Sequence, residues 1–133
     1  MPDGLPAREL VAFLGSQGFE PLWVREGAAG FDILDSEAPD GLVCDLSGPG
    51  IDGLRVVQVG SERNPEICSI VVARPEEIEL GTEAMRRGAY DFQVRPLNLG
   101  KIGAVLQRGL TYQRLVGEVS DLHRRLDDRY RVG

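Results

Sequence analysis

The sequence is poor in the residues that mark metal sites, disulfide frameworks and nucleic-acid surfaces. Its 133 residues include one histidine, two cysteines and a single lysine. The formal net charge is −6, so we expect no surface that binds a phosphate backbone or an anionic membrane directly. Both cysteines, Cys44 and Cys68, lie in apolar runs and are too few for a disulfide framework or a metal knuckle. They are expected to be reduced and buried.

Long apolar stretches are also missing. No run approaches the ~18 residues of a membrane-spanning helix. Residues 1–4 have neither the positive charge nor the apolar stretch of a signal peptide. The hydrophobic fraction of 42% and the charged fraction of 27% are ordinary for a globular domain. These features predict a soluble cytoplasmic protein without contact to a membrane.

Helical and strand-like patterns alternate along the chain. Apolar residues at helical spacing predict helices over residues 6–17, 28–36, 51–62 and 75–88, with a long helix from Asn98. Strand-like runs cover residues 19–24, 41–46, 67–73 and 90–94. Such an alternation requires parallel strands joined by right-handed crossovers, with helices on both faces. It predicts an α/β fold with a doubly wound parallel sheet, in which the β-branched run 67–73 lies centrally.

Candidate site positions lie at the carboxyl ends of three of these strands. Asp45 ends one strand, Ala73 and Arg74 end the next, and Arg95 follows the last. Sheets of this kind carry their chemistry at the carboxyl ends of the strands. From the residues alone, Asp45 is either a carboxylate presented for modification or the polar end of a buried strand.

Two sequence blocks resemble the receiver domain of bacterial two-component response regulators, which has a flavodoxin-like, CheY-like fold. DLSGPGIDGL, residues 45–54, is similar to the phosphoacceptor Asp of that family with its following Pro and Met-Asp-Gly. EAMRRGAYDFQVRP, residues 83–96, resembles the Glu-Ala-Met-x-x-Gly-Ala-x-x-Phe-x-x-Lys-Pro block. The resemblance runs from Leu10 to about Gly109. It implies a receiver-like domain over residues 1–110 that acts in signal transduction and is not an enzyme.

The resemblance assigns Asp45 to the phosphoacceptor position, Ala73 to the switch Ser or Thr, Phe92 to the rotating aromatic and Arg95 to the Lys. An aspartyl phosphate forms only where carboxylates hold a divalent cation and another cation clamps the phosphoryl oxygens. Ala73 has no hydroxyl to sense that group. Arg95 keeps the charge but is longer and planar. We therefore expect a vestigial site in which Arg95 contacts Asp45.

The family's first strand, which lies between the second and third and ends in the acids that hold magnesium, has no counterpart here. Only Asp3 falls near one of those acids, which leaves Asp3 and Asp45 as candidate metal ligands. A carboxylate near a chain terminus is a poor ligand. The expected sheet has four strands, and no cofactor is expected unless the site is phosphorylated, when magnesium would be required.

Beyond Gly109, apolar residues continue at spacings of three and four: Tyr112, Leu115, Val119, Leu122 and Leu126. This seam predicts a coiled-coil linker helix over residues 111–133 and a homodimer. The alternative is one amphipathic helix that folds back on its own sheet. The ending LDDRYRVG resembles the linker to the AAA+ ATPase domain in NtrC-type activators of sigma-54 promoters. His123 lies on the solvated side of this helix and is expected to be a surface residue.

Two functions remain open. One is an atypical receiver, a dimeric interaction module that controls a sigma-54 transcription activator of the AAA+ type without phosphorylation. The other is a functional receiver, phosphorylated at Asp45 by a histidine kinase. A third reading, a nucleotide-binding flavodoxin-like protein, is disfavoured because the loop over residues 48–50 is too short to cradle a phosphate.

Overall fold

The sheet consists of three parallel strands in the described part of the chain. The computed structural model describes residues 7–22, 27–46 and 52–130. The strands follow one another in the order β1 (Gly41–Asp45), β2 (Cys68–Ala73) and β3 (Asp91–Val94). Every residue of β2 is buried, which confirms the prediction that the β-branched run lies mid-sheet.

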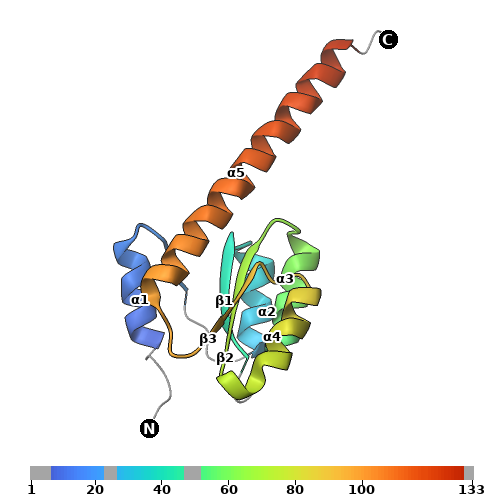
Figure 1. Cartoon of the computed structure of the whole chain (residues 1–133). Coiled ribbons are helices and arrows are strands. Elements are labelled where there is room, and N and C mark those ends of the chain that lie inside the picture. Colours follow the sequence, from blue (N-terminus) through green and yellow to red (C-terminus); the bar gives the residue numbers. More distant parts are fainter. Residues whose placement is uncertain (1–6, 23–26, 47–51, 131–133) are drawn as a thin grey trace.

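Helices cover both faces of this sheet, as Figure 1 shows. On one face lie α1 (Ala7–Ser16) and the first part of α5 (Leu99–Tyr130). On the other lie α2 (Gly27–Ser36), α3 (Gly53–Arg63) and α4 (Ile78–Arg86), the last preceded by the 3₁₀ turn Pro75–Glu77. The two cores meet at β2, because Ile70 packs toward α1 and α5 while Val71 packs toward α3 and α4. The fold is thus α/β and CheY-like, as predicted.

The strand predicted over residues 19–24 is wrong for its described part. Residues 19–22 form no strand, and residues 23–24 lie outside the described residues. Gly18, with φ of +93°, ends α1, and the Phe19 amide donates to the Leu14 carbonyl rather than to a neighbouring strand. Pro21 has no N–H to offer a ladder. The described sheet accordingly has three strands and not the four that were expected.

The long helix α5 changes its surroundings part-way. Ile102, Val105 and Leu106 are buried in the core, whereas the helix beyond Gln113 projects away from the sheet (Figure 1). The predicted boundary between residues 110 and 111 falls inside this continuous helix, and the division into two domains stays a prediction. No helix in the described ranges is long and apolar enough to cross a membrane.

Candidate functional site

Asp45 and Arg95 meet at the carboxyl ends of the strands. The Arg95 Nη2 atom donates a hydrogen bond to Asp45 Oδ2, so the contact predicted from the sequence is confirmed. Asp45 ends β1 and Arg95 follows β3, and the pair therefore spans the end of the central strand. The Arg95 amide donates to the Ala73 carbonyl at 2.9 Å, which fixes the arginine backbone there. The Arg95 side chain is 16% exposed and that of Asp45 is 36% exposed, so water screens the pair only in part.

Ala73, between these two residues, is fully buried and brings no side-chain hydroxyl. The loop after it is held by its own residues. The Glu77 Oε1 atom accepts hydrogen bonds from both the amide and the Nε of Arg74, each at 3.2 Å. The Glu77 amide in turn donates to the Arg74 carbonyl at 2.9 Å. Sequence reasoning missed this clamp, although a glutamate three residues after the cap position and a proline at the first helical position are a recognisable local pattern.

Phe92 lies in the core between the sheet and α4. It packs against the cluster that contains Val71 and Ala84. The ring lies so close to the α4 backbone that a Cβ added at Gly81 would approach its atoms to 2.3 Å. The backbone of Gly81 therefore makes room for the aromatic ring. The assignment of Phe92 as the rotating aromatic of the family stays a prediction.

A magnesium site does not fit the described residues. Asp3 lies outside them, as do residues 47–51 of the loop after Asp45. The Asp45 carboxylate bonds Arg95, and Asp52 accepts the Arg55 amide as the N-cap of α3. Within the described ranges, no group of three or more histidine, cysteine or acidic residues is placed so that it could hold a metal ion. Magnesium requires near-octahedral oxygen coordination, which these groups do not provide.

Both cysteines are buried free thiols, as expected. Burial, with smaller contributions from the nearby carboxylates of Asp45 and Asp52, raises the pKa of Cys44 to about 12. Burial, with a contribution from Asp91, raises the pKa of Cys68 to about 11. The thiolate is the nucleophilic form of cysteine, so neither side chain is equipped for covalent chemistry at neutral pH.

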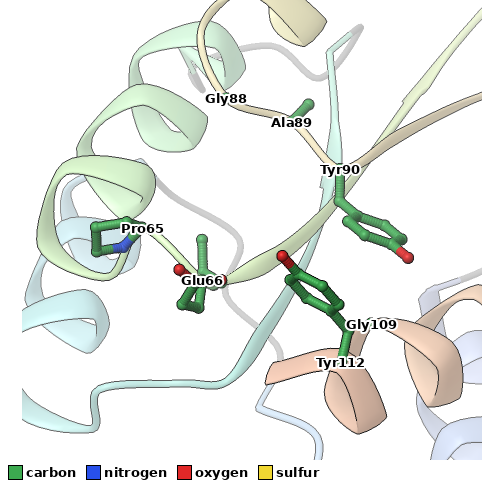
Figure 2. A pocket seen from close by; sticks show the side chains of 8 residues that line it. Pro65, Glu66, Gly88, Ala89, Tyr90, Gly109 and Tyr112 are labelled. Atoms are coloured by element: carbon green, nitrogen blue, oxygen red, sulfur yellow. The ribbon is translucent and has the colours of Figure 1, made fainter. Parts of the chain in front are cut away.

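A half-open cavity of about 250 Å³ lies at the opposite, amino edge of the sheet. Ile67 just before β2, Tyr90 just before β3, and Gly109 and Tyr112 of α5 contribute to its wall. Figure 2 shows the Tyr112 hydroxyl turned toward Glu66 across the cavity, while Tyr90 points away. This hollow lies beside the first residue of the predicted seam.

The five predicted seam residues are all exposed. Their exposed fractions run from 45% to 57% for Tyr112, Leu115, Val119, Leu122 and Leu126. This part of the helix does not fold back on its own sheet, and that alternative is wrong. His123 is exposed, as expected of a surface residue. The role of the seam in a dimer stays a prediction.

Comparison with known proteins identifies the family. The response regulator receiver domain model matches residues 3–107. The chain belongs to this family. Its members are signalling modules rather than enzymes. The match includes the candidate site at Asp45, Ala73 and Arg95.

The similar proteins are regulators of the NtrC and NtrX kind. The regulatory protein AtoC of Escherichia coli K12 is 26% identical over 126 residues, covering 95% of this chain and 27% of AtoC. The nitrogen assimilation regulatory protein NtrX of Azorhizobium caulinodans is 25% identical, covering 93% of this chain and 28% of its own length. A crystal structure of NtrX from Brucella abortus superposes with a TM-score of 0.77 at 30% identity, covering 90% and 28% of the two chains. The chain thus spans little more than a quarter of these relatives.

Proposed function

We propose that this chain is an atypical receiver: a dimeric signalling module of the cytoplasm that controls a sigma-54 transcription activator of the AAA+ type without phosphorylation of Asp45. One observation carries the proposal, namely the bond between Asp45 and Arg95 beside the hydroxyl-free Ala73. In this arrangement the Arg95 guanidinium already pairs with the Asp45 carboxylate. The missing hydroxyl removes the group that would respond to a phosphoryl oxygen.

The chemistry of phosphoryl transfer supports this. Transfer to a carboxylate needs a divalent cation on the transferred group, because charge is spread over its equatorial oxygens in the transition state. Of the two nearby acids in the described residues, Asp45 is engaged by Arg95 and Asp52 caps α3. Arginine suits a lasting ion pair with a carboxylate because its guanidinium is always charged and forms directed hydrogen bonds. We therefore interpret the pair as a structural substitute for a phosphorylation site.

The exposed seam on α5 supports dimerisation. Tyr112, Val119 and Leu126 occupy one core position of a heptad, and Leu115 and Leu122 occupy the other. Val119 at the first position, with leucine at the second, is the combination that favours two strands, although Tyr112 and Leu126 fill the other first positions. A contiguous apolar stripe has no partner within the described part of the chain, and a second copy of the same stripe would bury it.

The nature of the output rests on sequence. The ending LDDRYRVG resembles the linker to an AAA+ ATPase domain in NtrC-type activators. The relatives include a transcriptional regulator of E. coli, NtrC, which is 25% identical over 99 residues. We propose that an AAA+ output domain, attached or on a partner protein, reads the geometry of the dimer. The receiver itself makes no direct contact with nucleic acid.

The experiment is incubation with a small phosphoryl donor and magnesium, followed by intact mass spectrometry. We expect no added phosphoryl group on the wild-type protein. The proposal fails if the protein gains one phosphoryl group and Asp45→Asn abolishes the gain. Asp52→Asn is the matched control, since Asp52 is an acid a few residues away that caps α3.

The second candidate is a functional receiver that a histidine kinase phosphorylates at Asp45. It is favoured by the position of Asp45 in the family pattern and by the partial exposure of its carboxylate. Magnesium would then be the cofactor, with Asp3 and Asp45 among its ligands. A stoichiometric mass increase that depends on magnesium would select this function over the first.

A further inference from the structure

Gln113 is the residue through which α5 makes its last hydrogen bonds to the globular part of the protein. Its Nε2 atom donates to the Glu66 carbonyl at 2.6 Å and to the Asp40 carbonyl at 3.2 Å. Asp40 immediately precedes β1, and Glu66 lies two residues before β2. Within the described residues beyond Gln113, no hydrogen bond or ion pair is recorded between α5 and the rest of the chain.

One helical turn earlier, α5 is pressed against the central strand. A Cβ added at Gly109 would lie 2.3 Å from the Cys68 Sγ atom, so only a glycine allows this approach. Gly109 and Gln113 are four residues apart and therefore lie on the same side of the helix. The helix is thus in close contact at Gly109, bonded at Gln113, and exposed from Tyr112 onward along its apolar stripe.

We propose that Gln113 is a positioning residue, a latch that fixes the direction in which the free part of α5 leaves the sheet. A glutamine amide carries two N–H donors, and the two carbonyls that it bonds belong to separate loops. Through these bonds, the direction of the exposed part of α5, from Tyr112 onward, depends on the loops before β1 and β2. This input lies at the amino edge of the sheet, opposite the pair formed by Asp45 and Arg95. This inference rests on the proposed function in one respect: the exposed part of α5 is taken to pass the signal to the output domain.

Spin labels on α4 and α5 test the latch in the full chain. Cysteines replace Glu79 and Ser120, which are both exposed and lie off the apolar stripe. Cys44 and Cys68 are buried with raised pKa values and stay unlabelled at neutral pH. The labelled chain is mixed with an excess of unlabelled chain, so that the distance reports on one chain whether or not it dimerises. The distance distribution is measured by pulsed electron resonance.

Gln113→Leu removes both donors and leaves an apolar side chain that is one atom shorter, and Gln113→Glu places a carboxylate against two carbonyl oxygens. We expect both to broaden and shift the distribution. The matched controls are Gln107→Leu and Gln107→Glu, because Gln107 is exposed on the same helix and has no recorded hydrogen bond. These should leave the distribution unchanged.

An unchanged distribution in Gln113→Leu, with the melting temperature of the wild type, would overturn the latch. If that variant does not fold, Gln113→Asn decides, because it keeps the donors but is too short to reach both carbonyls. A broadened distribution in Gln113→Asn supports the latch, and a wild-type distribution rejects it. Sedimentation of the same samples measures dimerisation separately, so a monomeric protein would reject the proposed dimer without bearing on the latch.

Discussion

The two parts of α5 share one helix and differ in what covers them. From Leu99 to Gly109, the apolar side chains of Ile102, Val105 and Leu106 are nearly inaccessible to water. From Tyr112 onward, the apolar side chains at the same kind of spacing are about half exposed. The helical pattern alone does not distinguish the two parts. One stripe is covered within the chain, while the other is left exposed in the described residues, which is the basis of the proposed dimer.

The largest expected effect comes from the covered part. Ile102 is fully buried against Ile70, so Ile102→Ala should lower the free energy of unfolding by about 2–5 kcal/mol through lost burial and a cavity. Leu115→Ala, on the same helix but exposed, should change it by less than about 1 kcal/mol in dilute protein. Urea denaturation followed by circular dichroism measures both. Equal losses would contradict the division of α5 into two parts.

Substitutions in the exposed part of α5 should change self-association of the protein rather than its folding stability. Leu122→Glu places a charge in the middle of the seam and should weaken self-association by roughly a hundredfold, about 2.7 kcal/mol. Ser120→Glu adds the same charge off the stripe and should have little effect. Sedimentation equilibrium gives the dissociation constants. A similar loss in both variants would mean that net charge, and not the seam, governs association.

Alanine substitutions at two glycines of α5, one in each part, should change the stability of the protein in opposite directions. Gly109→Ala should destabilise the fold by about 1–3 kcal/mol, since the new methyl group would collide with the Cys68 side chain. Gly117 has no neighbour within 4 Å of an added Cβ, so Gly117→Ala should stabilise the helix by about 0.5–1 kcal/mol. Thermal unfolding measures both. Destabilisation by both substitutions would mean that the whole helix is covered, and stabilisation by both would mean that the whole helix is exposed.

The effect of the buried thiol beside the site is absent at neutral pH and appears only in alkaline solution. The pKa of Cys44 is raised from 9.0 to about 12 by burial, so the unfolded chain loses the thiol proton first as pH rises. Its contribution to stability is complete below pH 9 and is lost between pH 9 and about 12. At pH 10 the loss is roughly 1 kcal/mol. Cys44→Ser should lack this part of the decline in urea titrations. An identical decline in the variant would place Cys44 in contact with water.

Much of the fold could be predicted because local patterns, namely helical spacing of apolar residues and a β-branched run, indicate its elements. The predicted helices and the central β-branched strand all appear in the described residues. The segment 19–22 was misassigned because its composition resembles a strand, whereas the Phe19 amide is taken by the C-terminus of α1. A strand needs a neighbour, and composition does not reveal one.

The candidate site was predictable to the same degree. The contact between Asp45 and Arg95 was predicted because the receiver resemblance places Arg95 at the position of the Lys that pairs with the acid. The bonds of Gln113 were not foreseen, because a side chain that reaches backbone carbonyls 47 and 73 residues away leaves no local pattern. In the sequence, Gln113 looks like an ordinary polar residue beside the seam.

Sedimentation velocity of the whole chain, before and after incubation with acetyl phosphate and magnesium, tests the central claim most directly. The bond between Asp45 and Arg95 and the exposed seam predict a dimer of unchanged sedimentation coefficient in both samples. A protein that is monomeric at high concentration, or one that dimerises only after treatment with the phosphoryl donor, would contradict it.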